Sequence, residues 1–412
     1  MLFTRDSFKR LWCICNYISL TCFLTACSGQ AEEVSSLPDN EGIEAAAEDI
    51  NAESMAGGID IETTVENIDT EPADEDVDAN LPAEDIEIVL GFAGDFNLDE
   101  NWVTTRHMDS LSDGIHGCIS PNLIDTMQSF DVFMLNNEYT YSLRGTPTSG
   151  KSYTFRANPD RVKILDELGV DVVLLANNHV GDYGEEALLD TLETLEADNM
   201  PYVGAGRNIS EASRPWYYSV GDYKIAYCAA SCAESYAARY WTKAATDTEP
   251  GILDCYDPDL FLESIRKAKA EADYVIANIH WGLEYSYYRD DFQKELGRMA
   301  IENGADIVIG SHPHVLQGID FYNDKPVFYS LGNYWFNEKD LYSEIVYVSL
   351  ILSGDHHGLS VKEYGLIPCT QYGLYTSSDS ESQEWTDIIA FLNKISYNAT
   401  VDNNGIVRPK EN

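Results

Sequence analysis

Basic residues are scarce in this chain of 412 residues, which contains 26 Lys and Arg against 70 Asp and Glu. The formal net charge of −44 at pH 7 would repel a polyanion such as DNA, because nucleic-acid binding depends on neutralising backbone phosphates. The composition therefore argues against a nucleic-acid partner, whereas cations would be attracted. Basic and aromatic residues are absent altogether from residues 31–85, which contain 19 Asp or Glu.

A segment of this composition cannot bury enough apolar surface to offset the entropy that ordering costs. Residues 28–85 are therefore predicted to form an acidic, disordered linker. Its like charges would keep it extended. We interpret it as a spacer without a binding role of its own, holding the folded part away from a membrane.

The most apolar stretch, "LWCICNYISLTCFLTACSG" at residues 11–29, is too short and too interrupted to predict a transmembrane helix. It follows Arg5, Lys9 and Arg10, and a positive start before an apolar stretch is typical of an export signal. The "LTAC" that ends at Cys27 resembles the bacterial lipobox. We therefore predict a signal peptide over residues 1–27 and an exported lipoprotein, anchored through Cys27 to the extracytoplasmic face of the bacterial cell membrane. The alternative is a signal anchor that is never cleaved.

No CxxC pair or zinc-type spacing occurs among the cysteines that follow this signal. Their odd number leaves at least one without a disulfide partner, and we interpret them as mainly structural. They are Cys118, Cys228, Cys232, Cys255 and Cys369.

From Ile86 onward, short apolar runs alternate with segments of helical periodicity, which indicates a layered α/β fold. We expect mixed, largely parallel β-sheets flanked by helices, in a domain over residues 86–375 followed by a C-terminal helix and tail over 376–412. The predicted strands are 86–93, 132–136, 172–176, 225–230, 274–279, 306–310, 326–331 and 345–352. The predicted helices are 159–168, 184–197, 258–272, 290–303 and 383–395.

Polar side chains recur where the apolar runs end. "DVFMLNNE", "DVVLLANNH", "DYVIANIH" and "DIVIGSHPH" each begin with Asp and lead through an apolar run to a carboxylate, amide or imidazole, and "IEIVLGFAGD" leads similarly to an Asp. If the strands are parallel, these groups meet at one sheet edge, where open α/β sheets bind ligands. The groups belong to Asp95, Glu138, Asn178, His179, His280, His312 and His314.

Imidazole and oxygen donors without thiols suit Mn, Fe or Zn. Seven groups exceed the needs of one tetrahedral ion, whereas two ions that share a carboxylate, roughly 3.5–4 Å apart, would use them better. Taken singly, each residue is better explained as a turn, loop or structural residue. Four strands that end in the same way favour a metal site.

Six sequence blocks resemble the CapA family of bacterial poly-γ-glutamate capsule biosynthesis proteins, which are similar in fold to calcineurin-like metallophosphoesterases. The resemblance extends over about residues 86–370. The blocks are "GDFN" at 94–97, "NNE" at 136–138, "ANNHVGDYG" at 176–184, "HWGLEY" at 280–285, "GSHPHVLQG" at 310–318 and "YSLGNYWF" at 329–336.

The resemblance implies two divalent ions joined by the carboxylate of Glu138. Asp95 and His314 would bind the first ion. His179 would act as a general acid above the substrate. The ligands implied for the second ion are Asn178, His280 and His312.

Asp182 has two interpretations: it orients the imidazole of His179, or it caps the following helix together with Glu185 in a capping box. The chain also departs from the family pattern. Asn137 replaces the usual Leu of "NLE", and Asn97 stands where metallophosphoesterases usually carry a His, so the first ion has fewer protein ligands. The aromatic residues that follow His280 would form either a substrate wall or part of the core; they are Trp281, Tyr285, Tyr287 and Tyr288.

The resemblance and the residues favour different functions. The family favours a protein of poly-γ-glutamate synthesis or export, with the polymer or its synthesis machinery as partner. The residues favour a metal-dependent phosphoesterase acting on a cell-envelope or nucleotide substrate, in which His179 would protonate the leaving oxygen. A third possibility is a binding module that kept the fold without the chemistry.

Overall fold

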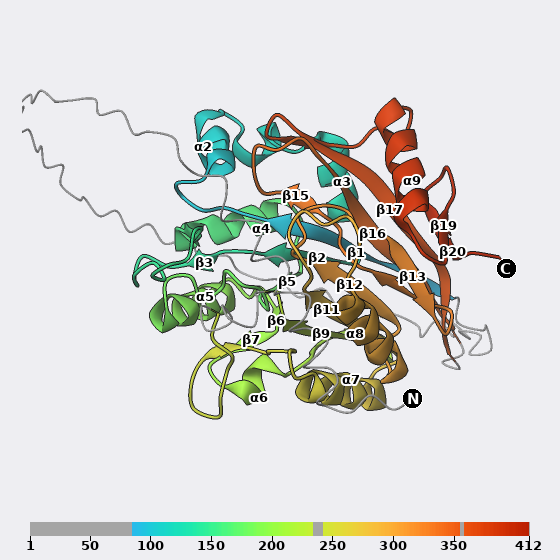
Figure 1. Cartoon of the computed structure of the whole chain (residues 1–412), viewed down its shortest axis with the longest axis horizontal. Helices are drawn as coiled ribbons and strands as arrows, with labels where there is room; N and C mark the ends of the chain where they lie inside the picture. The colour runs from blue at the N-terminus through green and yellow to red at the C-terminus, as the bar shows by residue number, and fades with distance from the viewer. Residues whose placement is uncertain (1–84, 234–241, 355–357, 412) are drawn as a thin grey trace, which may run out of the picture. The chain divides into compact units, whose positions relative to one another are not determined.

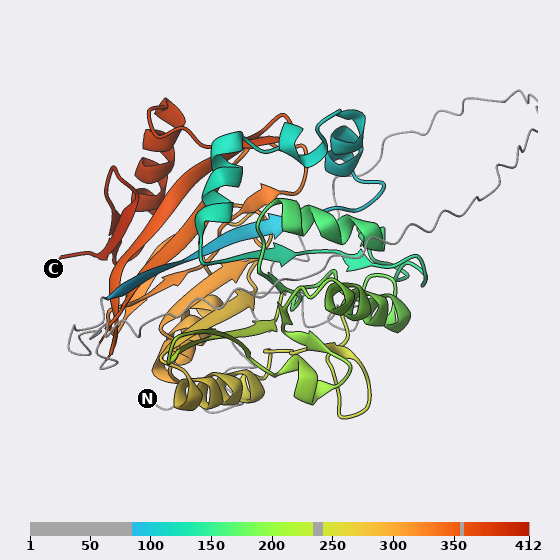
Figure 2. The ribbon, with the colours of Figure 1, turned by 180° about the vertical axis from the view of Figure 1, so that it is seen from behind.

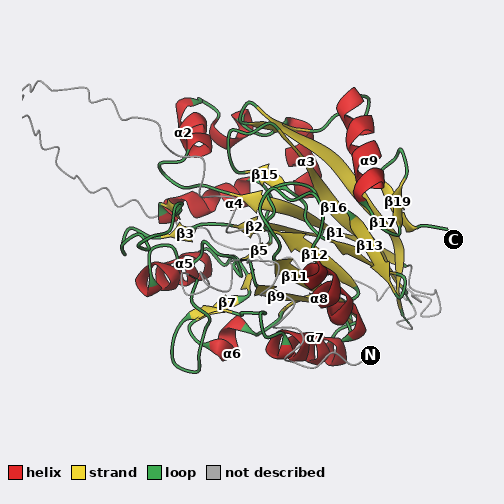
Figure 3. Cartoon of the chain, in the orientation of Figure 1, coloured by secondary structure: helices red, strands yellow, loops and turns green. Residues whose placement is uncertain are grey.

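Two β-sheets packed face to face form the centre of the protein, and helices cover the outer face of each sheet (Figure 1, Figure 3). The structure is a computed structural model that describes residues 85–233, 242–354 and 358–411. The predicted signal, Cys27 and nearly all of the predicted linker lie outside these residues. Within these ranges, no helix has the length and apolar character needed to cross a bilayer.

The larger sheet has ten strands in the order β19-β20-β17-β16-β1-β2-β5-β6, with β15 also paired to β1 and β18 to β17. Its strands β1, β2, β5 and β6 are parallel, and β16, β17, β20 and β19 continue it in antiparallel pairs. The bounds are β1 Ile86–Phe96, β2 Val132–Asn137, β5 Val172–Leu174, β6 Tyr202–Val203, β15 Asn333–Trp335, β16 Leu341–Leu352, β17 Leu359–Tyr372, β18 Tyr375–Ser377, β19 Ala399–Val401 and β20 Ile406–Pro409.

The smaller sheet has six strands in the order β13-β14-β12-β11-β9-β8. Strands β9, β11, β12 and β14 are parallel, and the two edge strands are antiparallel to their neighbours. The bounds are β8 Trp216–Val220, β9 Tyr223–Ser231, β11 Tyr274–His280, β12 Ile307–Ser311, β13 Ile319–Tyr322 and β14 Lys325–Phe328. Two short pairs lie apart from the main sheets: β3 Thr140–Tyr141 with β4 Arg156–Ala157, and β7 Ala205–Gly206 with β10 Gly251–Ile252.

Helices pack on both outer faces. Buried residues of α2, α3, α4 and α5 join the core behind the larger sheet, as Figure 2 shows from behind, and α7 and α8 join the core behind the smaller sheet. Helix α9 instead packs with the residues that lie between the sheets. The bounds are α2 Val103–Ser110, η2 Gly114–Gly117, α3 Pro121–Ser129, η3 Pro159–Val162, α4 Lys163–Glu167, α5 Glu185–Ala197, α6 Ile209–Ala212, α7 Asp259–Glu271, α8 Asp291–Glu302 and α9 Gln383–Ile395.

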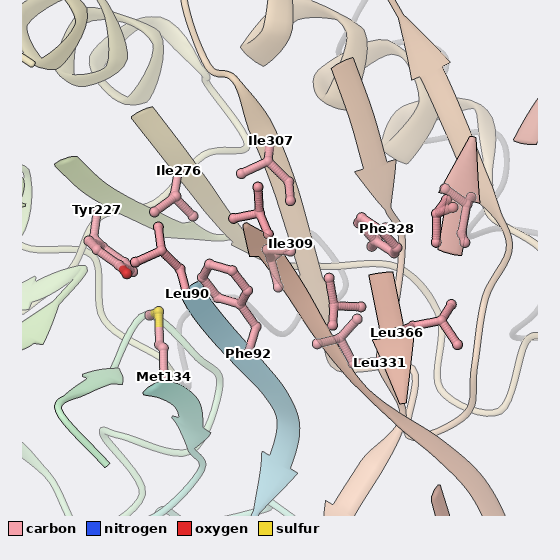
Figure 4. Close-up of a cluster of buried hydrophobic side chains, with 14 of the residues drawn as sticks. Leu90, Phe92, Met134, Tyr227, Ile276, Ile307, Ile309, Phe328, Leu331 and Leu366 are labelled. Carbon is pink, nitrogen blue, oxygen red and sulfur yellow. The ribbon is translucent and has the colours of Figure 1, made fainter. Parts of the chain in front are cut away.

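The alternation of side chains along each central strand explains the layering. In β2, Val132 and Met134 join the core between the sheets, whereas Phe133 and Leu135 join the core under the helices. Successive strand residues point to opposite faces, so a strand covered on both faces is apolar throughout. Figure 4 shows Leu90, Phe92 and Met134 of the larger sheet facing Tyr227, Ile276, Ile307 and Ile309 of the smaller one.

The layered, mixed α/β fold is confirmed, and every predicted strand and helix overlaps an observed element. One expectation about the sheets was wrong. The polar strand ends do not share one sheet edge, because β1, β2 and β5 belong to the larger sheet and β11 and β12 to the smaller one. Strand β17 and helices α2 and α3 were not predicted.

Glu344 of β16 is an unusual feature of this core. Its side chain is fully buried, and neither carboxylate oxygen has a hydrogen-bond partner among the described residues. Burial raises its pKa from an ordinary value of 4.5 to about 8. The folded protein therefore holds a proton that the unfolded chain releases, so stability declines as pH rises from 4.5 to 8.

We expect Glu344→Gln to raise the free energy of unfolding by about 3 kcal/mol at pH 8.5 and by less than ~1 kcal/mol at pH 4.5, because the amide is never charged. Urea denaturation of both proteins across this pH range measures the difference. Glu338→Gln at an exposed position is the matched control. A stability difference that does not change with pH would contradict the assignment.

Candidate metal centre

The predicted site residues come together where strands of the two sheets end. Asp95 lies in β1, Glu138 follows β2, and Asn178 and His179 follow β5, all from the larger sheet. His280 ends β11, and the two histidines after β12 complete the set from the smaller sheet. Every one of these side chains is buried, with at most 6% of its surface exposed.

Glu138 belongs to two groups of potential metal ligands. One contains Glu138, His280 and His312, and the other contains Asp95, Glu138 and His314. Within each group the ligand atoms lie within 4.8 Å of one another. The shared carboxylate is the arrangement expected of two ions joined by one bridging residue.

Asn178 lies beside the first of these groups. Its Oδ1 is 2.8 Å from Nε2 of His280, and the other nitrogen of that ring, Nδ1, is 2.8 Å from the hydroxyl of Ser311. His280 Nε2 also lies 3.6 Å from Oε1 of Glu138. Asn178 and His280, which the family resemblance assigns to the same ion, therefore lie side by side.

The turn after β12 directs two imidazoles into the site. His312 has φ of 98° and His314 has φ of 58°, which are left-handed conformations that non-glycine residues seldom adopt. Such a conformation costs about 1–3 kcal/mol per residue and persists only where neighbouring structure holds it. Between them, the Pro313 carbonyl accepts a hydrogen bond of 2.8 Å from the backbone N–H of Tyr285.

Two glycines bring the backbone close together at Asp95. A Cβ atom on Gly94 would lie 1.9 Å from the carbonyl oxygen of Gly332, so no side chain fits there. The same carbonyl accepts a 3.0 Å hydrogen bond from the Asp95 N–H. Gly332 has φ of 70°, a left-handed conformation that glycine adopts without strain.

The two carboxylates at the centre differ in their electrostatics. Burial opposes ionisation of Asp95, but its hydrogen bond to His314 and the charge of that imidazole hold its pKa below its ordinary value. Burial, followed by the charge of Asp95, raises the pKa of Glu138 well above its ordinary value. Two adjacent buried carboxylates disfavour each other's ionisation unless positive charge is supplied.

The three imidazoles respond to the same environment. Burial, together with the neighbouring imidazoles, lowers the pKa of His280 well below its ordinary value, and burial lowers that of His312 to about 4. Burial also opposes protonation of His314, but the hydrogen bond and charge of Asp95 outweigh it and raise the pKa. The lowered pKa values favour the neutral form of His280 and His312, which is the form of imidazole that binds metal ions.

His179 and Asp182 form a hydrogen-bonded pair beside Glu138. The Nδ1 of His179 lies 2.6 Å from Oδ2 of Asp182, and its Nε2 lies 3.8 Å from Oε1 of Glu138. Asp182 does not cap the following helix, because Gly184 occupies the N-cap position without a side-chain hydrogen bond. The capping-box interpretation was therefore wrong, and the geometry agrees with the orienting role.

Lys151 and Asn136 are site residues that were not predicted. Lys151 Nζ lies 2.8 Å from Oδ1 of Asp182 and donates to the backbone carbonyl of Asn178. The amide of Asn136 donates to Asp95 Oδ1 at 2.8 Å and to Glu138 Oε2 at 3.0 Å. Asn136 stands within the "NNE" block and so carried a signal, whereas Lys151 lies in a loop without a recognisable motif.

The two departures from the family pattern have local explanations. Asn97 Oδ1 accepts a 2.7 Å hydrogen bond from the Asp99 N–H, so this side chain supports its own loop. Asn137 donates to the carbonyl of Tyr139 at 3.0 Å. Among the aromatic residues, Trp281 is a core residue at 0% exposure, whereas Tyr285 is 42% exposed and its ring lies 5.9 Å from that of His314.

The donor set fits divalent metal ions. Glu138 Oε1 and His312 Nδ1 are buried and have no hydrogen-bond partner in the described part of the chain. A buried carboxylate oxygen without a partner costs free energy that a cation at this position would offset. Carboxylate, amide and imidazole donors are the ligands of Mn, Fe and Zn.

Comparison with known proteins agrees with the sequence blocks. Residues 89–338 match the family described as "Bacterial capsule synthesis protein PGA_cap". The chain is 36% identical over 203 residues to the "PGA biosynthesis protein CapA" of Bacillus subtilis and 37% identical over 192 residues to the "Capsule biosynthesis protein CapA" of Bacillus anthracis. It is 30% identical over 210 residues to a "Probable polyglutamine synthesis accessory protein" of Mycobacterium tuberculosis.

These alignments cover 49%, 46% and 49% of this chain and 52%, 45% and 55% of the respective relatives, so each spans about half of the relative's length. A hypothetical protein from Thermus thermophilus aligns over 69% of this chain and 98% of its own, with 13% identity and a TM-score of 0.38. That likeness is too weak to carry an argument. The family match covers more than half of the chain and contains every predicted ligand. The chain therefore belongs to the PGA_cap family of bacterial capsule synthesis proteins, which confirms the resemblance to the CapA family.

Proposed function

We propose that this protein acts in the synthesis or export of a poly-γ-glutamate capsule and that it uses a two-ion metal site to do so. The observation that carries the proposal is that one family match contains all six predicted ligands, which lie together at the junction of the two sheets. The names of the two Bacillus relatives support the polymer assignment. A metal site would allow a capsule synthesis protein to carry out the phosphoesterase chemistry that the residues favour.

In this proposal, Glu138 would contact both ions. Asp95 and His314 would hold one of them. The residues that would hold the other are Asn178, His280 and His312. Divalent ions bound here would supply Lewis-acid polarisation of a phosphoryl oxygen and would lower the pKa of a water molecule.

The chain itself would manage one proton. Asp182 accepts the hydrogen of His179 Nδ1, which leaves Nε2 directed toward Glu138. Nε2 is therefore the atom that would carry a proton to a leaving oxygen. Burial lowers the pKa of His179, so its protonated form is a stronger acid than an exposed imidazolium. Lys151 forms an ion pair with Asp182 and donates a hydrogen bond to the backbone carbonyl of Asn178, so it would fix these two residues in place.

The pair of His179 and Asp182 also favours a second candidate function, a metal-dependent phosphoesterase that acts on a cell-envelope or nucleotide substrate. An imidazole oriented by a carboxylate beside two candidate metal sites is the constellation of a general acid. The two functions are compatible, since the chemistry could serve capsule synthesis. A binding module without chemistry is the outcome if His179 proves dispensable.

We further propose that the protein is exported and held at the membrane through lipidation of Cys27. The support is the order of residues 5–27, in which basic residues precede an apolar stretch and a lipobox-like "LTAC". A membrane anchor would place the metal site on the side of the membrane where a capsule is assembled.

The first prediction from the proposed function concerns metal binding. We expect the chelator-treated protein to bind about two Mn²⁺ per chain, and Glu138→Gln to weaken both sites at least ~10-fold, because the variant loses the shared carboxylate. Isothermal titration calorimetry measures both. His116→Ala, at an exposed position, is the matched control. A Glu138→Gln protein that binds Mn²⁺ like wild type would show that this carboxylate is not a ligand.

The second prediction concerns turnover. We expect His179→Ala to lower kcat on bis(p-nitrophenyl) phosphate by about 10²–10⁴ with Mn²⁺ stoichiometry unchanged, since a general acid donates a proton without binding metal. Asp182→Asn should reduce kcat by a smaller factor. Wild-type protein that is inactive with every divalent ion tested would eliminate the phosphoesterase candidate and leave the capsule role open.

The third prediction concerns the capsule. In the bacterium that encodes this chain, deletion of the gene should abolish surface poly-γ-glutamate, and wild-type protein should restore it. Glu138→Gln should not restore the polymer. His179→Ala should restore it if the protein acts as a scaffold without chemistry, and should not restore it if capsule synthesis needs catalysis. Polymer is measured as glutamate released by acid hydrolysis of washed cells. Unchanged polymer in the deletion strain would disprove the capsule role.

A further inference from the structure

Two cysteines lie opposite each other behind the metal centre. Strand β9 ends at Ser231, which forms a parallel bridge with Asp254. The Ser231 N–H donates to the carbonyl of Leu253 at 2.9 Å, and the Cys255 N–H donates to the carbonyl of Ser231 at 3.0 Å. Because Ser231 is in register with Asp254, the next residue on each segment, Cys232 and Cys255, is opposite the other.

This register brings the two residues to disulfide distance. Neighbouring strands lie about 4.7–4.9 Å apart, and disulfides join residues whose Cα atoms are roughly 4.4–6.8 Å apart. Burial is the first cause of the raised pKa of the Cys232 thiol, and a hydrogen bond to Cys255 is the second. Both side chains are buried, with 4% and 0% of their surface exposed.

The other described cysteines are not arranged in this way. Cys228 belongs to the same core, but its sulfur lies 3.8 Å from the hydroxyl of Ser264. Cys118 and Cys369 belong to the core behind the other sheet. The structure therefore provides a reason for one particular pairing, which the spacing of the cysteines in the sequence does not.

We propose that Cys232 and Cys255 form a disulfide bond when the protein folds in an oxidising medium. The two thiols lose two protons and two electrons, a bond forms between their sulfur atoms, and one disulfide of the oxidant is reduced to two thiols. Oxidised glutathione represents this class of oxidant. Since both thiols are buried in the folded protein, the bond forms during folding.

The bond would fasten the strand that carries His280. The Cys232 N–H donates to the His280 carbonyl at 2.9 Å, and the hydroxyl of Ser231 donates to the same carbonyl at 3.2 Å. The disulfide would also close a loop of 22 intervening residues, which restricts the unfolded chain. It would thus stabilise the fold directly beside the metal centre, whatever reaction that centre performs.

The test is a refolding experiment on the full chain. The protein is unfolded in urea with reductant, refolded in a glutathione redox buffer, alkylated under denaturing conditions and mapped by tryptic mass spectrometry. We expect a cross-linked pair of peptides that contain Cys232 and Cys255. We also expect reduction to lower Tm by roughly 5–10 °C.

Matched variants identify the partner sulfur. Cys228→Ser should keep the cross-link and the Tm shift, whereas Cys232→Ser should lose both. Complete alkylation of Cys232 and Cys255 in refolded wild-type protein would overturn the proposal, and so would a cross-link that survives in Cys232→Ser. The peptide map of the wild type decides the question even if a variant does not fold.

Discussion

A carboxylate buried between two β-sheets sets the main physical constraint on this protein. Glu138 is fully buried, its Oε1 accepts no hydrogen bond from the described residues, and Asp95 lies close enough to raise its pKa. Water does not compensate such a charge in the interior, so the surrounding groups must. The amide of Asn136 donates a hydrogen bond to Glu138, and the imidazoles around Glu138 are potential ligands of a cation that would balance the charge.

The backbone around the site adopts conformations and contacts that most residues cannot tolerate. The left-handed conformations of His312 and His314 and the contact between Gly94 and Gly332 are unfavourable or impossible for most residues. They persist because the two sheets pack rigidly on either side and fix the strand ends. Apolar packing between the sheets is thus what holds polar groups in a strained arrangement, as is common at functional sites.

The charge of the chain bears on its proposed contact with the capsule polymer. A net charge of −44 repels poly-γ-glutamate, which is also an anion. Bound divalent ions would supply local positive charge at the site, and Lys151 already lies there in contact with Asp182. Polymer contact confined to this region would therefore be consistent with an acidic surface elsewhere.

Sequence alone predicted the central strands, five of the helices, the residue types of the candidate site and the family, because short apolar runs that end in "NNE", "NNH", "H" and "HPH" are typical of buried strands with polar groups at their ends. It placed Asp95, Glu138, His280 and His314 in one site, and they do lie together. The tertiary structure alone decided that two sheets contribute them, since strand order depends on packing between distant segments. It also decided between the two interpretations of Asp182, which bonds to His179, and it placed Lys151 at the site and Cys232 opposite Cys255. Lys151 and Cys232 are separated from their partners along the chain by distances that follow no motif, so only the folded backbone brings these residues together.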